Sequence, residues 1–131
     1  VLERGRIQEG ISGLTQHGHL VVYAMVTLDQ EGKTPARTRD IRPRYTNFAE
    51  KAGIDPLVPR RMRDHLIELD MLSIIRARKS ASGSVGGEAY TFELRVEPST
   101  AIEVLEAVSR FESVDFNELA KRWLNEQQTL N

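Results

Sequence analysis

The run Pro59-Arg-Arg-Met-Arg-Asp-His-Leu-Ile-Glu-Leu-Asp-Met-Leu72, followed by Ile74-Ile-Arg-Ala-Arg-Lys79, decides the fold of this 131-residue chain. Proline is well placed as the first residue of a helix, because its missing N–H would be unpaired there in any case. Apolar side chains then recur at helical spacing, at Met62, Leu66 and Leu69. We therefore predict a helix over residues 59–72 that buries these three side chains.

Three arginines stand at the start of this predicted helix. At about 100° per residue, Arg60 and Arg63 point away from the core, while Arg61 lies on the opposite flank. A guanidinium group can donate to two acceptors at once, which suits phosphate oxygens and guanine edges. The alternative is a solvated face with local ion pairs, because Asp64 and Glu68 lie within reach of the arginines.

A β-hairpin is predicted directly after this helix. Residues 74–79 form a short strand, residues 80–88 a Ser/Gly-rich turn, and residues 89–96 alternate apolar and polar side chains as a half-buried antiparallel strand does. Two further helices, over residues 15–30 and 38–52, precede the arginine-rich helix. This order predicts an α+β, mainly α fold, a winged helix-turn-helix whose third helix is the recognition helix and whose hairpin is a two-stranded wing.

Three details of the upstream helices are predicted as well. The first helix, over residues 1–10, is polar and ends at the glycines at positions 10 and 13. Thr15 caps the next helix, whose side chains are apolar almost all round and mark it as the central core helix. Proline is tolerated only in the first turn of a helix. In the segment 38–52 we therefore expect a loose first turn, followed by a regular helix that begins near Pro43.

Two appended helices are predicted after the wing. One, over residues 98–111, is amphipathic, and the other begins at a capping box at Asp115 and buries Trp123. We therefore expect three parts. They are the end of a helix over residues 1–13, the winged-helix unit over residues 14–111 and a C-terminal helical extension over residues 112–131.

The charge of the chain is strongly uneven. Residues 33–79 hold twelve Lys and Arg against six Asp and Glu, a net charge of +6, whereas the other 84 residues hold six against thirteen, a net charge of −7. The whole-chain charge of −1 conceals this separation. A basic helix followed by a basic hairpin indicates a nucleic-acid-binding surface, because such a patch attracts phosphates.

The hairpin supplies further candidates for contact with nucleic acid. Arg76, Arg78 and Lys79 approach a turn whose tip holds Ser82 and Gly83. Residues this small can bring backbone N–H groups close to phosphates. The alternative is a flexible hairpin that makes no contact.

The start of the 38–52 helix is the third candidate. Arg37, Thr38 and Arg39 stand where a helix N-terminus with flanking cations can bind a phosphate. The alternative is a simple helix cap in a basic loop, and the sequence favours neither.

Composition and motifs exclude several classes of protein. The chain has no cysteine, which excludes disulfides and thiolate metal sites, and no apolar run approaches the roughly 18 residues of a membrane span. His17 and His19 diverge on a helix, so we expect surface or helix-start residues and no metal site. Phosphate-binding loops, nucleophile elbows and paired carboxylates are missing, so we predict no enzyme activity and no cofactor for this chain. We expect a cytoplasmic, nucleoid-associated protein with no membrane partner.

Four runs carry a family resemblance, and together they lie within residues 14–107. They are His19-Leu-Val-Val-Tyr-Ala-Met-Val, Pro35-Ala-Arg-Thr-Arg-Asp-Ile, Tyr45-x-x-Phe-Ala-Glu-Lys-Ala-Gly-Ile-Asp-Pro-Leu and Arg60-Arg-Met-Arg-Asp-His-Leu-Ile-Glu-Leu-Asp-Met-Leu. In these runs the chain resembles the C-terminal winged-helix domain of archaeal replication initiators of the origin-recognition-complex and cell-division-control family.

The resemblance implies a function that the residues alone do not give. Members of this family carry an N-terminal AAA+ ATPase domain, which uses ATP and Mg²⁺, bind double-stranded origin DNA and help to load the MCM helicase. By resemblance, this chain is the DNA-binding end of such an initiator, residues 1–13 end a linker helix from the ATPase domain, and other initiator subunits are further partners. The recognition role falls on Arg60, Arg61 and Arg63, and the wing role on Arg78, Lys79 and the 82–83 tip.

Two other functions stay open from the sequence. A winged-helix transcriptional regulator would need a dimer interface, for which the last predicted helix is the candidate. A protein-interaction module would use the same fold to dock another protein, and its basic face would be incidental. The wing also departs from the family pattern, because its tip carries no arginine.

Overall fold

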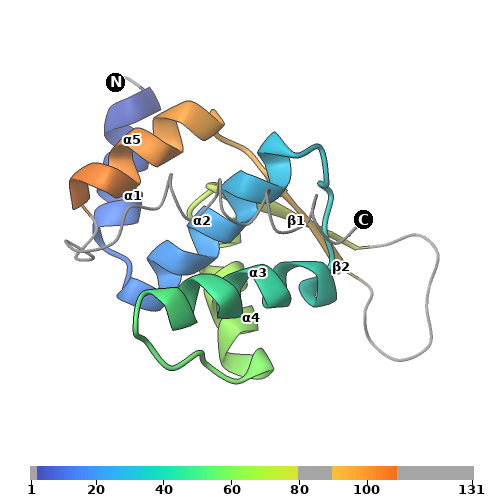
Figure 1. The fold of residues 1–131 in the computed structure, drawn as a ribbon. Coiled ribbons are helices and arrows are strands. Elements are labelled where there is room, and N and C mark those ends of the chain that lie inside the picture. Colours follow the sequence, from blue (N-terminus) through green and yellow to red (C-terminus); the bar gives the residue numbers. More distant parts are fainter. Residues whose placement is uncertain (1–2, 80–89, 109–131) are drawn as a thin grey trace.

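The computed structural model describes residues 3–79 and 90–108, which form five helices and a two-stranded sheet (Figure 1). The elements are α1 (Glu3–Ser12), α2 (Gln16–Gln30), α3 (Thr38–Lys51), α4 (Pro59–Met71), β1 (Ile75–Lys79), β2 (Tyr90–Leu94) and α5 (Pro98–Val108). This order confirms the predicted winged helix-turn-helix. The predictions for the wing tip at Ser82 and Gly83, and for a last helix with Trp123, lie outside the described residues.

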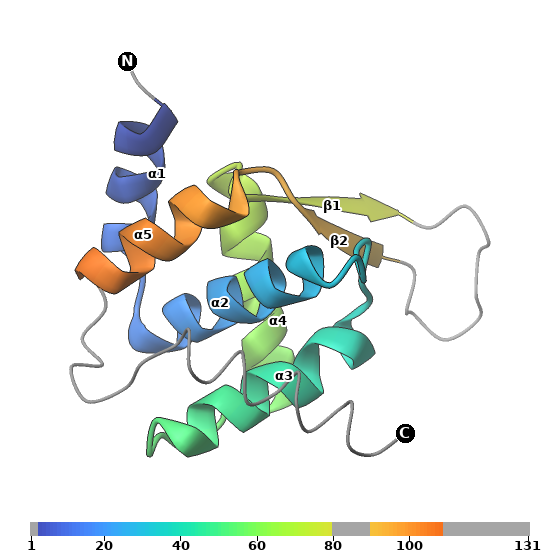
Figure 2. The same cartoon turned by 45° about the horizontal axis from the view of Figure 1, so that its top comes forward.

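Helix α2 is the centre of the core. Every residue from 18 to 28 is buried, and the helix lies between α1 and α5 on one side and α3 and α4 on the other (Figure 2). Thr15 caps its start as predicted, since the Thr15 hydroxyl accepts the N–H of Gly18 at 3.3 Å. A helix that is apolar all round must be covered on all sides, and this requirement organises the other helices around it.

The wing is anchored in the core at its base. β1 and β2 pair antiparallel, with Ile75 opposite Leu94, Ala77 opposite Phe92 and Lys79 opposite Tyr90. Phe92 is 2% exposed and also pairs with Ala36, so β2 lies between β1 and the segment that leads into α3. From this base the strands extend away from the helices (Figure 2).

The predicted ends of α1 and α3 were wrong. Helix α1 continues past Gly10 to residue 12, because Ile7 and Ile11 are fully buried and the glycine lies close to the Ile74 side chain. Helix α3 is regular from residue 38 although Pro43 lies inside it. Proline removes one backbone donor, but the buried side chains of the α3 stripe hold the helix against α2. Those side chains are Ile41, Tyr45, Phe48 and Ala49.

One residue of the basic segment is part of the core. Arg44 is 2% exposed, and its guanidinium forms a bidentate ion pair with Glu31 at 2.5 and 2.9 Å. It also donates to the Thr27 hydroxyl at 3.2 Å, while Lys33 lies 3.2 Å from the same carboxylate. The net charge of +6 therefore overstates what this segment presents to a partner.

Within the part of the chain that the structure describes, no helix is long and apolar enough to cross a bilayer.

Candidate nucleic-acid interface

The three arginines at the start of α4 are exposed, as predicted. Arg60 and Arg61 line a groove of about 830 Å³ along the helix, together with Val58, Asp64, His65 and Glu68.

Among the described residues, neither arginine forms an ion pair or a hydrogen bond, so the local pairing with Asp64 that the sequence allowed is not formed. Two guanidinium groups of this groove are therefore free to meet a ligand.

The expected grouping of the arginines on α4 was wrong. Arg60 shares the groove with Arg61, whereas Arg63 lies on the side of the wing, with its guanidinium carbon 6.0 Å from the centre of the Tyr90 ring. The helical wheel places Arg60 between the two flanks, and a long side chain there can extend to either one. Packing of the wing beside α4 gives Arg63 a different neighbour from the other two.

The basic residues of the wing are divided between its two faces. Side chains of paired residues lie on the same face of a sheet, so Lys79 shares the inner face with Tyr90, its partner, and with the buried Phe92. Arg76 and Arg78 lie on the outer face. Both approach the carboxylate of Glu93, at 4.0 and 3.4 Å, which leaves one net positive charge among the three groups. The structure thus places Lys79 near Arg63 and separates it from Arg76 and Arg78.

The start of α3 has the geometry of a helix cap. The backbone N–H of Arg37 donates to Asp40 at 3.0 Å, and Thr38 is the first helical residue. The carboxylate of Asp40 therefore already occupies this end of the helix and would repel a phosphate there. Arg39 is exposed. A role of Arg37, Thr38 and Arg39 in binding nucleic acid stays a prediction.

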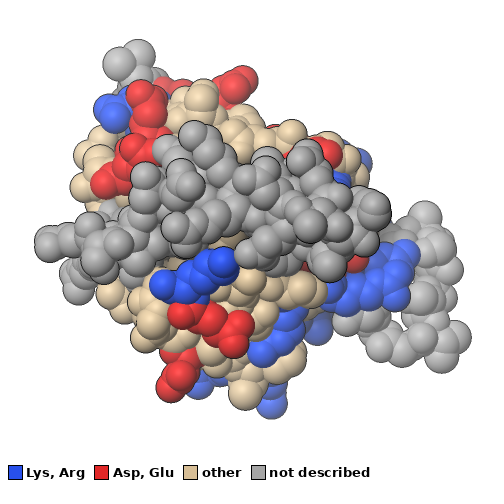
Figure 3. All heavy atoms as spheres, viewed as in Figure 1, with Lys and Arg blue, Asp and Glu red and all other residues tan. Residues whose placement is uncertain are grey.

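The surface view shows how charge is distributed on one face (Figure 3). Lys and Arg side chains gather at the lower right, towards the start of α3 and beside the wing, whereas Asp and Glu lie over α1 and α5 at the top and again at the lower left. The charge separation along the sequence is therefore only partly a separation in space on this face.

A cluster beneath α4 was missed by the sequence interpretation. The Tyr45 hydroxyl lies 2.8 Å from Nδ1 of His17 and accepts the N–H of Leu57 at 2.9 Å. The ring of His65 lies 6.5 Å from that of His17, so residues of α2, α3 and α4 meet here. Burial raises the pKa of Tyr45, and burial together with the charge of His65 lowers the pKa of His17. Nothing in the spacing of these residues along the chain indicates that they meet.

His17 and His19 lie in the first turn of α2, which confirms the predicted helix-start position. The side chain of His19 is nevertheless buried, at 4% exposed, and its Nε2 lies 2.8 Å from the carbonyl oxygen of Ile11. His19 is therefore part of the core, where α1 leads into α2.

We expect the lowered pKa of His17 to make stability depend on pH. An unfolded chain binds a proton near the ordinary pKa of 6.5, whereas the folded protein binds it only at lower pH. The unfolded state therefore takes up more protons as the pH falls below about 6.5, and the free energy of unfolding decreases. The melting temperature of the wild type should fall between about pH 7.5 and about pH 5.5 by more than that of His17→Gln. Equal decreases in both proteins would place the titrating group elsewhere.

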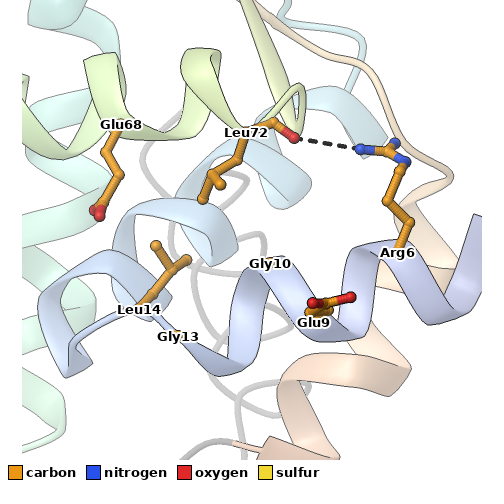
Figure 4. Close-up of a pocket in the computed structure, with 7 residues that line it drawn as sticks. All are labelled: Arg6, Glu9, Gly10, Gly13, Leu14, Glu68 and Leu72. Carbon is orange, nitrogen blue, oxygen red and sulfur yellow. Dashed lines mark hydrogen bonds between the residues drawn. The ribbon is translucent and has the colours of Figure 1, made fainter.

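A second groove, of about 380 Å³, lies between α1 and the end of α4 (Figure 4). Arg6 reaches across it and donates to the carbonyl oxygen of Leu72 at 3.2 Å. A cation at the carboxyl end of a helix satisfies a free carbonyl and is favoured by the helix dipole. Helix α1 thus fixes the far end of α4.

Among the described residues, no three His, Asp or Glu side chains lie close enough to hold a metal ion.

Comparison with known proteins identifies the family. The profile of the CDC6 C-terminal winged helix domain matches residues 9–104. The chain is 76% identical over 106 residues to ORC1-type DNA replication protein 11 of Haloarcula marismortui, which covers 81% of this chain and 26% of that protein. It is also 36% identical over 85 residues to the ORC1-type DNA replication protein of Pyrococcus furiosus, covering 65% of this chain and 20% of that protein. The chain spans about a quarter of the length of the first of these relatives.

Solved structures show the same likeness. The structure of the Aeropyrum pernix Orc1 protein in complex with DNA matches with a TM-score of 0.69 at 29% identity, covering 80% of this chain and 27% of that one. Cdc6p of Pyrobaculum aerophilum matches with a TM-score of 0.60, covering 76% of this chain and 26% of that one, and at 20% identity it supports the fold alone. Because the family profile covers most of the chain, the chain belongs to the Orc1/Cdc6 family of replication initiators and carries its C-terminal winged helix domain.

Proposed function

We propose that this chain binds double-stranded origin DNA, with α4 in the major groove and the wing beside it. The observation that carries this proposal is the set of exposed guanidinium groups at the start of α4, of which two are unpaired among the described residues and the third lies at the wing. The Aeropyrum pernix Orc1 structure, which matches this chain, was solved in complex with DNA. A recognition helix that reads bases with its N-terminal half is the usual arrangement of this fold.

The groove on α4 also carries acids, which restrict how it can bind. Asp64 and Glu68 repel phosphates, but a carboxylate can accept the amino group of cytosine in the major groove. We therefore infer that the face with Arg60, Arg61 and these acids meets base edges, while Arg63 and Lys79 meet the phosphate backbone. The first set would give specificity and the second affinity.

The whole initiator has functions that we place outside this chain. The chain spans about a quarter of its relatives' length, so we propose that ATP and Mg²⁺ are used in another part of the protein and that this part binds without catalysis. MCM helicase and other initiator subunits are proposed partners of the full protein. In this scheme the chain positions the initiator on DNA.

A salt titration tests DNA binding directly. The affinity of the chain for a fluorescent duplex should fall linearly with salt on logarithmic axes, with a slope of about −0.9 for each phosphate contact. The two phosphate contacts assigned to Arg63 and Lys79 give a slope of about −1.8. Absence of salt-dependent binding at about 50 mM salt would contradict the proposal.

A second candidate function is the docking of another protein, which exposed apolar side chains favour. Ile67 is 48% exposed and Met71 80% exposed, one turn apart on α4, and Val58 before the helix is 62% exposed. Apolar side chains gathered on one surface can mark a contact with another protein. This role gains support if the salt titration shows no DNA binding.

A further inference from the structure

Tyr90 occupies an unusual place at the junction of the wing and α4. It begins β2 and shares the inner face of the wing with Phe92, but Phe92 is 2% exposed whereas Tyr90 is 39% exposed. The Tyr90 ring thus lies past the edge of the core. A large aromatic ring left half-exposed at this point is not explained by core packing alone.

The ring of Tyr90 contacts a cation of α4. The guanidinium carbon of Arg63 lies 6.0 Å from the ring centre, within the range of a cation–π interaction. Among the described residues, Arg63 forms no ion pair, and its guanidinium lies beside this ring of the wing. Lys79 is directly opposite Tyr90 in the strand register, on the same face. Two positive charges therefore flank one aromatic ring.

The outer face of the wing offers an internal comparison. There Arg78 lies 3.4 Å from the carboxylate of Glu93, which cancels part of the charge of Arg76 and Arg78. An aromatic ring holds a guanidinium in place without cancelling its charge, and leaves its N–H donors available for another acceptor. The inner contact thus orients an arginine that can still bind an anion.

The base of the wing is tied to α4 by a second bond. The N–H of Ala77 on β1 donates to the Asp70 carboxylate at 2.9 Å. Asp70 lies two turns after Arg63, so α4 touches the hairpin at two levels. The relative position of helix and wing is therefore fixed at the base, and the ring contact sets where the Arg63 side chain points.

We propose that Tyr90 is a positioning residue, which orients Arg63 so that Arg63 and Lys79 contact phosphates in the same stretch of the DNA backbone. This inference rests on the proposed function, because it assumes that the chain binds DNA. It gives the outer end of the wing strands, where Lys79 pairs with Tyr90, a role in binding DNA. Tyr90 acts through Arg63 and is not itself the ligand of a phosphate.

A double-mutant cycle tests the proposal, with the full 131-residue chain and a fluorescent duplex. Tyr90→Leu removes the ring and should weaken binding about two- to fivefold. Tyr90→Phe keeps the ring, so it should bind like the wild type. In an Arg63→Gln background, Tyr90→Leu should cause no further loss, because the group that it positions is gone. Thermal denaturation of each variant shows whether the fold is retained.

Each contrary result has a distinct meaning. An equal loss from Tyr90→Leu in both backgrounds would overturn the proposal, since Tyr90 would then act on DNA or on the fold directly. A loss from Tyr90→Phe as large as that from Tyr90→Leu would overturn it too. Wild-type affinity in Tyr90→Leu would overturn this inference and leave the proposed function intact. Absence of DNA binding by the wild type would overturn both.

Discussion

Replacing Arg60 and Arg63 together by alanine is expected to weaken duplex binding by about ten- to a hundredfold, since each lost contact is worth roughly 1 kcal/mol or more. One arginine lines the groove of α4 and the other lies at the wing, so the pair samples both parts of the proposed surface. The loss should shrink as the salt concentration rises. Because Arg63 is assigned to a phosphate and Arg60 to a base edge, the salt slope should become shallower by about 0.9.

A control of equal charge change separates a local contact from a general electrostatic effect. Arg4 lies on α1 and Arg95 follows β2, and both are exposed. Replacing these two by alanine changes the net charge as much as the test pair does. We expect this control to retain most of the affinity and the original salt slope. A binding isotherm unchanged by Arg60→Ala with Arg63→Ala would count decisively against α4 as the recognition helix.

Glu31→Ala is expected to lower the free energy of unfolding by about 3–5 kcal/mol, because it removes the carboxylate that pairs with the buried guanidinium of Arg44. Arg44 is 2% exposed and donates to both oxygens of this carboxylate. The Thr27 hydroxyl is too weak an acceptor to replace a charge. Chemical denaturation measures the loss.

Two further variants establish that the cause is the buried charge. Adding Arg44→Met to Glu31→Ala removes the buried cation and should recover most of the stability. Glu103→Ala breaks an ion pair with Arg4 whose side chains are both more than half exposed, so it should cost less than about 1 kcal/mol. If Glu31→Ala is no more destabilising than Glu103→Ala, the bidentate pair does not stabilise the fold as we infer.

Much of the fold could be predicted because it depends on local patterns. The helical spacing of Met62, Leu66 and Leu69 placed α4, and the glycine-rich turn between two short strands placed the wing. Thr15 capped α2 as expected. Pro43 misled the prediction for α3, since local propensity opposes a helix there and only burial against α2 outweighs it.

The candidate site could be predicted in part. The exposure of the α4 arginines could be predicted from helical periodicity, because the spacing of residues within one helix is enough to show which side chains face away from the core. The neighbours of each arginine do not follow from it. Arg44 looked like a surface cation and lies in the core, while Arg76 and Arg78 look continuous with Lys79 and lie on the other face.

The sequence by itself determined the order of elements, the capped and buried faces of the helices and the concentration of positive charge between residues 33 and 79. Only the tertiary structure decided which of those charges reach the surface and which meet one another. Arg63 meets Tyr90, and His17 meets Tyr45, across 27 or more residues of chain. Periodicity specifies the direction of a side chain within its own helix or strand, whereas such contacts depend on how separate elements pack, and this is set by the core that they share.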